Sequence, residues 1–319
     1  MKPKLSILIV SYNTREMTLA CLRSVHEQAQ SADFEIVLVD NASVDGSAGA
    51  VAAAFPQVRL LAETENHGFA RANNLAAKVA RGDYLLLLNP DTLVLDQALD
   101  KLVAFAEQRP EAGIWGGRTL FGDGSLNPTS CWRRPTLWSL FCRAAGLSLL
   151  FPRSEVFNPE SYGGWRRDTV RHVDIVTGCL FLIRRATWER LGGFSSDFFM
   201  YGEETDLCLR ARALGCRPAI TPDATILHYG GASEKTRAGK VVKLFAAKIE
   251  LIRRHWPVWQ RGAGVFLMVL WALTRHAGYA LLARLTPTVQ RREEAAAWAE
   301  VWRQRRVWRA GYRSGRAAD

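Results

Sequence analysis

The segment LSILIVSYN (residues 5–13) decides the fold, because a short apolar run passes directly into small polar residues. The same arrangement recurs in FEIVLVDNAS (34–43) and YLLLLNPD (84–91). Apolar runs of this kind are typical of strands that are buried on both faces. Segments with helical periodicity separate the runs, at residues 15–30, 47–55 and 69–80. This alternation predicts an α/β fold with a doubly wound, mostly parallel sheet.

Polar residues follow three of the predicted strands. They are residues 11–13, residues 40–43 and residues 89–91. Ligands of doubly wound sheets bind outside the carboxyl ends of the strands. Asn, Asp and Ser are also common turn and helix-cap residues, so each site alone has a structural explanation. Because all three strand ends are polar, the sequence predicts a binding site along this edge.

The net charge of +11 is concentrated in the C-terminal part of the chain. Residues 253–319 contain 13 Arg, no Lys and four acidic residues, a net charge of +9, and six of the 11 Trp. The remaining 252 residues carry a net charge of only +2. We therefore expect two domains, at residues 1–250 and at residues 251–319, the second being a basic, Trp-rich helical extension. No nucleic-acid-binding motif accompanies the charge, so nucleic acid is not an expected partner.

Cysteine spacing and the N-terminus both favour the cytoplasm. The six cysteines form no CxxC pair and have no zinc-ligand spacing, as expected of buried free thiols in a reducing compartment. The only apolar run near the N-terminus, at residues 5–10, is too short for the core of a signal peptide.

Four motifs in the N-terminal half carry a specific resemblance. They are VSYN (10–13), VDNASVDGS (39–47), NHGFARANN (66–74) and LLLLNPDT (85–92). In this order they resemble the motifs of family 2 glycosyltransferases with the GT-A fold, in particular the bacterial rhamnosyltransferase-like branch. The resemblance covers roughly residues 4–235 and implies an enzyme that uses a nucleotide-diphosphate sugar.

The donor residues follow from these motifs and from simple chemistry. Asp40 can accept hydrogen bonds from a pyrimidine imide and from a ribose hydroxyl, and the resemblance implies the same role. Gly68 allows close approach of the backbone before a helix whose N-terminus can face phosphate. Arg71 and Asn74 share one face of that helix, although Arg71 could equally be a solvated charge. The expected donor-binding residues are Ser11, Asn13, Asp40, Asn41, Ser43, Asn66, Gly68, Arg71, Asn74, Asn89 and Asp91.

A divalent metal, Mg²⁺ or Mn²⁺, is the expected cofactor. Asn89-Pro90-Asp91 stands where the family has its Asp-x-Asp motif, which implies that Asp91 binds the metal. Asn89 contributes no negative charge, and this departure implies a weaker site. The resemblance also places His228 at the metal or the diphosphate, whereas a lone His is more often structural. Imidazole is better suited to Mn²⁺ than to Mg²⁺.

Acidic residues at 203–206 (EETD) provide the expected catalytic base. Inverting transfer needs a carboxylate that removes a proton from the acceptor hydroxyl. The resemblance implies Glu204 for this role, with Asp206 as the alternative, and Thr205 is the expected N-cap of the following helix. Tyr201 and Glu203 are expected to contact the acceptor. The acids could instead only complement the helix dipole.

The C-terminal extension is expected to bind an anionic membrane surface. Residues 262–285 are apolar, but their longest uninterrupted stretch is 13 residues. A span needs about 20 residues, so no simple transmembrane helix is predicted. In residues 295–309, one helical face has apolar side chains beside arginines, a pattern typical of lipid interfaces; it consists of Trp298, Val301, Trp302 and Trp308. These helices could instead pack on the catalytic domain or in a homodimer.

The leading hypothesis is an inverting glycosyltransferase on the cytoplasmic face of the inner membrane. It would move a sugar such as rhamnose to a lipid-linked or glycan acceptor in cell-surface polysaccharide synthesis. A sugar nucleotidyltransferase is the second hypothesis, although residues 11–14 lack the Gly-rich loop of that class. The third is a catalytically degenerate, membrane-bound scaffold, which Asn89 and Glu204 would explain.

Overall fold

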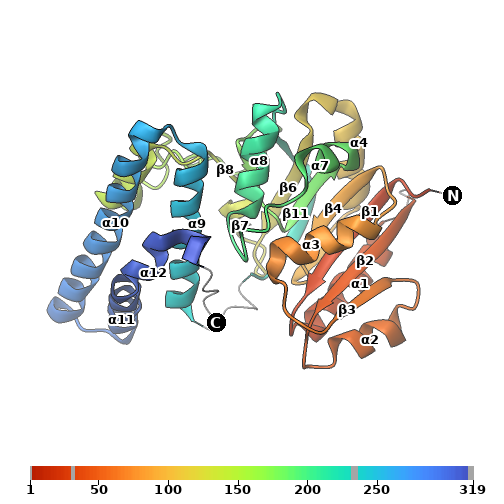
Figure 1. The fold of residues 1–319 in the computed structure, drawn as a ribbon, viewed down its shortest axis with the longest axis horizontal. Helices are drawn as coiled ribbons and strands as arrows, with labels where there is room; N and C mark the ends of the chain where they lie inside the picture. Colours follow the sequence, from red (N-terminus) through yellow and green to blue (C-terminus); the bar gives the residue numbers. More distant parts are fainter. Residues whose placement is uncertain (1, 30–32, 231–235, 315–319) are drawn as a thin grey trace. The chain divides into compact units, whose positions relative to one another are not determined.

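The computed structural model describes residues 2–29, 33–230 and 236–314, and the chain forms two compact units (Figure 1). The sheet unit comprises residues 1–132, 165–199 and 203–233. The helical unit comprises residues 133–164, 200–202 and 234–319. The helical unit thus begins before the expected boundary at residue 250, which falls inside helix α9 (Arg237–His255), and it includes an insertion from the middle of the chain.

The sheet unit contains a mixed sheet in which β1 is central to the N-terminal half. The strand order is β3-β2-β1-β4-β11-β6-β12-β5. The first four strands along the chain are parallel, which confirms the predicted doubly wound half, whereas β11 runs antiparallel to both β4 and β6. The strands are β1 (Leu5–Ser11), β2 (Phe34–Asn41), β3 (Arg59–Glu63), β4 (Tyr84–Leu88), β5 (Thr92–Val94), β6 (Ile114–Leu120), β11 (Leu180–Arg184) and β12 (Ala219–His228).

Helices pack on the sheet, and the core between them is mostly aliphatic. Helix α3 packs on β1 and β2, and α4 packs on β6 and β12. Every residue of β1 and β4 is buried. The helices are α1 (Arg15–Gln28), α2 (Ser47–Ala54), α3 (Gly68–Val79), α4 (Ala98–Gln108), α7 (Arg185–Leu191) and α8 (Glu203–Ala213). Short elements complete the unit: η1 (Pro110–Ala112), β7 (Leu126–Asn127), η2 (Pro128–Ser130), β8 (Cys131–Trp132), β9 (Arg171–His172) and β10 (Ile175–Val176).

Helix α8 starts earlier than the sequence predicted. Thr205 lies inside the helix instead of capping it, because the first turn already begins at Glu203. All three acids of the segment therefore occupy the first turn, where they complement the helix dipole.

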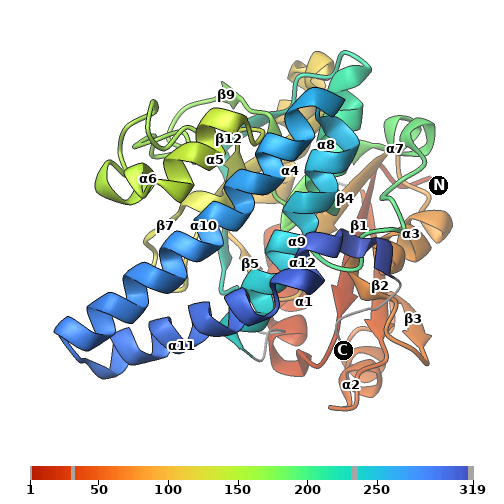
Figure 2. The same ribbon diagram turned by 60° about the vertical axis from the view of Figure 1, so that its left-hand side comes forward.

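The helical unit has a core of its own, in which Trp298 and Trp308 are buried. Its elements are α5 (Leu137–Ala144), α6 (Leu147–Leu150), α9, α10 (Val258–Leu285), α11 (Val289–Arg303), α12 (Arg305–Ala310) and η3 (Gly311–Ser314). Figure 2 shows α10 and α11 side by side, and the two helices are in contact. Trp298 and Trp308 pack edge-on against Phe245 of α9, and Val301 is also buried.

The expectation that this tryptophan face contacts lipid is therefore wrong. Trp308 is fully buried, and its indole N–H donates to the Val301 carbonyl at 2.9 Å. An amphipathic pattern shows that one face is covered, and here the cover is the protein itself. Helix α10 is different, because it is long and apolar enough to cross a membrane by length and composition alone, which the interrupted apolar run did not predict.

The cysteines match their prediction as free thiols. Five of them are buried and Cys216 is half-buried. Burial raises the pKa of Cys21 to about 12, which keeps that thiol protonated and unreactive.

Candidate active site

The loops after β1 and β2 hold each other through Asn13 and Ser43. The Asn13 N–H donates to Ser43 Oγ at 2.9 Å, and the Val44 N–H donates to Asn13 Oδ1 at 2.8 Å. Asn13 has a φ of 54°, a left-handed conformation that Asn adopts more readily than most residues. This reciprocal pair fixes the two loops against each other beside the end of β2.

Asp40 is the second-to-last residue of strand β2 and lies opposite Ser11 in the register of the sheet. Its Oδ2 atom accepts a hydrogen bond from the Ser43 N–H at 3.1 Å. Its Oδ1 atom is buried and has no hydrogen-bond partner among the residues that the structure describes. A buried oxygen without a partner costs about 1–3 kcal/mol. Asp40 thus offers one acceptor atom for a ligand.

Asn41 and Asn66 connect the end of β2 with the start of α3. Asn41 Nδ2 donates to Asn66 Oδ1 at 2.9 Å, and Asn41 Oδ1 accepts from the His67 N–H at 2.9 Å. Asn66 Oδ1 also accepts from the Gly68 N–H at 2.9 Å. Both side chains therefore shape the loop, and through it they determine where α3 begins.

Gly68 allows a close approach, but to a protein segment. Its φ is +71°, and a Cβ atom at this position would lie 2.5 Å from the Phe199 carbonyl oxygen. The Phe69 N–H donates to the same oxygen at 2.9 Å. The space that the sequence assigned to a phosphate at this residue is thus filled by Phe199.

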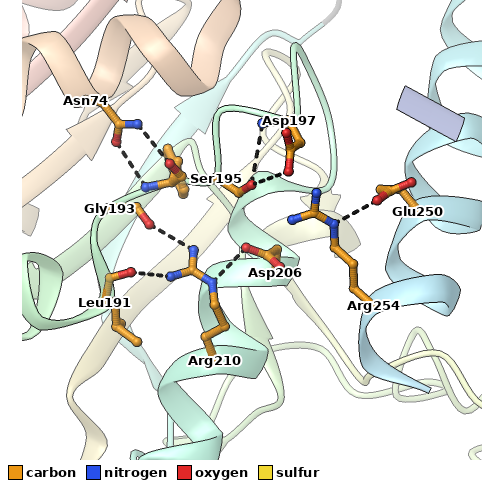
Figure 3. Close-up of polar contacts among 10 residues, drawn as sticks. Asn74, Leu191, Gly193, Ser195, Asp197, Asp206, Arg210, Glu250 and Arg254 are labelled. Carbon is orange, nitrogen blue, oxygen red and sulfur yellow. Dashed lines mark hydrogen bonds and ion pairs between the residues drawn. The ribbon is translucent and has the colours of Figure 1, made fainter. Parts of the chain in front are cut away.

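Of three further donor candidates, Ser11 and Asn74 are hydrogen-bonded within the protein, and Arg71 lines a groove on the surface of the sheet unit. The Ser11 hydroxyl is buried, 2.9 Å from the Thr18 hydroxyl. Asn74 donates to the Phe194 carbonyl at 2.9 Å and accepts from the Phe194 N–H at 3.0 Å (Figure 3). Arg71 is exposed and lines, together with Asn74, a groove of about 580 Å³ along α3 and α7.

Asn89, Asp91 and His228 lie close to one another in the structure. Pairing of β12 with β5 sets His228 opposite Thr92, although the two are far apart in the chain. His228 Nε2 lies 3.3 Å from Asp91 Oδ1 and 3.3 Å from Asn89 Nδ2. Asp91 Oδ2 accepts from the Gly230 N–H at 3.0 Å.

The oxygen of Asn89 completes this cluster. Asn89 Oδ1 is buried and lacks a hydrogen-bond partner within the described ranges. The Asn89 N–H donates to the Cys179 carbonyl at 3.2 Å, which fixes the residue at the end of β4. Burial acts to lower the pKa of His228, but Cys179 and the Asp91 carboxylate outweigh it and raise the pKa to about 10. The imidazole therefore holds a proton beside Asp91, and it would have to release this proton to bind a metal.

The fit to a divalent cation rests on oxygen atoms. The described part of the chain contains no group of three or more His, Cys, Asp or Glu arranged to hold a metal. The cluster offers instead one carboxylate, one amide oxygen without a partner and one imidazole. Hard cations prefer such oxygen donors, and substrate phosphates commonly supply the remaining ligands.

The three acids at the start of α8 differ in accessibility. Glu203 and Asp206 are buried, whereas Glu204 is partly exposed. Asp206 accepts from Arg210 Nε at 2.8 Å, and the same guanidinium donates to the Leu191 and Gly193 carbonyls (Figure 3). Asp206 is thus part of the framework, and Glu204 is the acid that solvent reaches.

Tyr201 precedes α8 in a strained turn. It is half-buried and has a φ of 71°, which is unfavourable for a bulky residue. Residues 200–202 belong to the helical unit, in which the Tyr312 hydroxyl donates to the Met200 carbonyl.

The segment 176–179 connects Asn89 with the surroundings of Glu204. The Cys179 carbonyl holds the Asn89 N–H. The Cys208 side chain bonds to the backbone of Val176, and burial together with the nearby Glu204 carboxylate raises the Cys208 pKa to about 12. The end of β4 and the start of α8 therefore share one neighbouring segment.

Sequence reasoning missed several residues that build this site. The Asp206–Arg210 pair has the spacing of an i,i+4 ion pair on a helix, which is a readable signal. Phe199 and Gly230 act through backbone atoms, so their side chains gave no signal. Cys179 acts through its carbonyl on Asn89 and through its thiol beside His228.

Comparison with known proteins decides the family. The profile of glycosyl transferase family 2 matches residues 6–191. The chain belongs to glycosyl transferase family 2. This confirms the resemblance drawn from the four motifs.

Relatives agree with the rhamnosyltransferase-like branch. The chain is 30% identical to the N-acetylglucosaminyl-diphospho-decaprenol L-rhamnosyltransferase of Mycobacterium tuberculosis, over 70% of this chain and 76% of that protein. It is 30% identical to rhamnosyltransferase WbbL of Escherichia coli, over 51% and 61%. It is 31% identical to the O-antigen biosynthesis protein RfbC of Myxococcus xanthus over 74% of this chain, but spans only 18% of that protein.

A solved structure confirms the fold. The mannosyltransferase PcManGT of Pyrobaculum calidifontis, in complex with GDP-Man and Mn²⁺, superimposes with a TM-score of 0.59. The match covers 97% of this chain and 88% of that one at 21% identity, which supports the GT-A-like fold alone.

Proposed function

We propose that this family 2 member is an inverting glycosyltransferase that uses a nucleotide-diphosphate sugar. One observation carries the proposal: Asp40 Oδ1 and Asn89 Oδ1 are buried acceptors without partners in the described residues, at the ends of the two strands that flank β1. Such atoms are rare in folded proteins and indicate a missing donor or cation. Nucleoside N–H and O–H groups are suitable donors for Asp40, and a cation suits Asn89.

The nucleoside would bind at the loops after β1 and β2. Asp40 would accept from the base or the ribose, while the Asn13–Ser43 pair keeps both loops in place. Asn41 and Asn66 would act indirectly, because their amides are used to position α3. The shape of this pocket would select the sugar and the nucleotide of the donor. One candidate donor is dTDP-rhamnose.

A divalent cation would bind at Asp91, with Asn89 Oδ1 and His228 as further candidate ligands. Bound there, Mg²⁺ or Mn²⁺ would neutralise charge on the diphosphate leaving group. The imidazole favours Mn²⁺. Arg71 stays a candidate for contact with the anionic donor, since its guanidinium is exposed at the N-terminal end of α3.

Glu204 would be the general base. Its carboxylate takes the proton of the acceptor hydroxyl while that oxygen attacks the anomeric carbon. The bond between this carbon and the phosphate oxygen breaks, and the nucleoside diphosphate leaves with the electron pair. Glu204 is preferred over Asp206 because Asp206 is buried against Arg210. Tyr201 and Glu203 would help to position the acceptor.

The acceptor would be a lipid-linked sugar or a glycan of a cell-surface polysaccharide. The mycobacterial relative is named for a lipid-linked substrate, which supports this choice. We place the protein at the cytoplasmic face of the inner membrane, peripherally attached, and a homodimer is compatible with this arrangement. Attachment would bring the enzyme to acceptors that are anchored in the same bilayer.

Release of nucleoside diphosphate from a panel of nucleotide sugars tests the reaction. The purified chain is incubated with each sugar, Mg²⁺ or Mn²⁺, and a membrane extract. Glu204→Gln should reduce transfer at least a thousandfold, roughly the effect of losing a catalytic acid–base group, while donor affinity changes little. Glu111→Gln, an exposed residue of the same unit, is the matched control.

Three results would contradict the proposal or its assignment of the base. Release of pyrophosphate in place of nucleoside diphosphate would indicate a nucleotidyltransferase. A chain that binds no member of the panel would be the catalytically degenerate scaffold. Equal loss of transfer and of donor affinity in Glu204→Gln would remove Glu204 as the base.

A further inference from the structure

Helix α10 exposes a continuous apolar stripe. Its members recur at spacings of three or four residues, which places them on one face of the helix. Within the most apolar 18-residue window of α10, only 11% is buried in the protein. We call these residues the outer stripe: Trp259, Ala263, Phe266, Leu270, Leu273, Ala277 and Leu281.

Three large members of the outer stripe are strongly exposed, Leu273 is exposed to a lesser degree, and Leu270 is half-buried. Trp259 is 78% exposed, Phe266 64% and Leu281 56%. The opposite face of α10 is buried through Gly264, Met268 and Ala272, in contact with the other helices of the helical unit. Isolated exposed apolar residues are ordinary, but a contiguous stripe marks a binding surface.

The polar residues that interrupt the apolar sequence do not interrupt the stripe. Arg275 donates to the Arg143 carbonyl at 2.9 Å, on the protein side of the helix. The Arg261 guanidinium similarly donates to the Trp256 carbonyl at 2.9 Å. Thr274 donates to the Ala144 carbonyl at 2.8 Å. The apolar surface therefore continues from Trp259 to Leu281, a length of about 33 Å at the helical rise.

This one-sided arrangement favours a helix that lies in the plane of a membrane. A helix that crosses a bilayer would bring Arg261, Arg275 and their partners into hydrocarbon, which is costly. A helix with one apolar and one protein-covered face can instead bury only its outer side at the lipid boundary. Helix α6 and the residue that follows it, in the same unit, add exposed apolar side chains at Leu149, Leu150 and Phe151.

The charge of the helical unit matches an anionic surface. This unit contains 22 basic and 8 acidic residues, a net charge of +14, whereas the sheet unit contains 20 and 23, a net charge of −3. Arg284, at the end of α10, is exposed. Basic residues near a membrane are attracted to anionic lipids. Two copies that paired through their basic helical units would instead repel each other, so this charge favours a membrane over a second copy at the outer stripe.

We propose that the outer stripe of α10 lies in the plane of an anionic bilayer surface and attaches the protein there. The proposal deepens the membrane attachment proposed above and replaces the tryptophan face of α11 with α10. It is independent of the transfer reaction, because membrane binding is measured without donor or acceptor.

Flotation of the full chain with vesicles tests this surface. The vesicles contain phosphatidylcholine with or without phosphatidylglycerol. Phe266→Gln with Leu273→Gln should weaken binding to anionic vesicles at least tenfold, since roughly two large side chains lose their burial in lipid. Val170→Gln with Val307→Gln, which removes two exposed valines outside the stripe, should bind like the natural chain. Trp259→Gln provides a second stripe variant that lies outside the core, and thermal unfolding verifies that each variant is folded.

Several outcomes would overturn the proposal. Equal binding of stripe and control variants would exclude the stripe, and equal binding to vesicles without phosphatidylglycerol would exclude the anionic surface. Retention in the membrane after alkaline carbonate extraction would show that α10 spans the bilayer. A dimer in sedimentation that the stripe variants dissociate, without vesicle binding, would show that the stripe binds a second copy. In each case the transfer assay with Glu204→Gln still reports separately on the proposed function.

Discussion

The sheet unit and the helical unit use their apolar and polar residues in opposite ways. In the sheet unit, the apolar strands are buried, and polar atoms without partners lie at the strand ends, as Asp40 and Asn89 show. In the helical unit, the buried core contains aromatic rings and ion pairs, and the outer stripe of α10 is exposed. The two units thus differ in what they leave unsatisfied, and the two proposals follow from this difference: polar atoms at the strand ends for a small ligand, and the apolar outer stripe for a membrane surface.

The largest expected effect is on the core of the helical unit. Trp308→Ala removes a fully buried ring that packs on Phe245, and should lower the free energy of unfolding by about 4 kcal/mol. Chemical denaturation followed by circular dichroism measures this change. If Trp308 contacted lipid instead, the variant would keep its stability and lose vesicle binding, and the contrast between α10 and α11 would be wrong.

A buried carboxylate makes the helical unit sensitive to acid. Glu160 lies within reach of Arg143 and Lys248. Burial acts to raise the Glu160 pKa, but the two cations outweigh it and lower the pKa from 4.5 to about 2. The ionised carboxylate therefore contributes stability above pH 4.5, and this contribution is lost as the pH falls through the folded pKa.

Glu160→Gln should remove this contribution. At neutral pH the variant should be less stable by about 3 kcal/mol, and the difference from the natural chain should shrink as the pH falls toward 2. Denaturation curves at a series of pH values measure it. Glu155→Gln, a more exposed acid of the same insertion, is the control. A difference that is independent of pH would show that Glu160 does not act through its charge.

Local patterns predicted the strands, because the apolar runs at residues 5–10 and 84–88 are buried strands in the structure. The rule for parallel sheets pointed to the polar residues after β4, whereas only the family resemblance pointed to His228. In the structure His228 lies close to Asn89 and Asp91. The structural roles of Gly68 and Asn74 could not be predicted from the sequence. Their partners, Phe199 and Phe194, are distant in the chain and interact through backbone atoms.

The helical unit was harder to predict, because the packing of its helices also depends on segments that are distant in the chain. Periodicity identified the amphipathic faces, but it does not say whether protein or lipid covers a face. Residues 133–164 belong to this unit and contact α10 through Arg143 and Ala144. Nothing in the linear sequence indicated that this insertion would bind Thr274 and Arg275 on one side of α10 and leave the outer stripe on the other side exposed.

The central claim is that oxygen atoms at the strand ends bind the nucleotide of a sugar donor. Calorimetric titration of the full chain with dTDP, UDP and GDP, in the presence of Mn²⁺, tests it most directly. Asp40→Ala should weaken binding of the preferred nucleotide at least tenfold, roughly the loss of one charged hydrogen bond, whereas Asp123→Ala, in an exposed turn, should not. An Asp40→Ala chain that is folded and binds the nucleotide as tightly as the natural one would contradict the account.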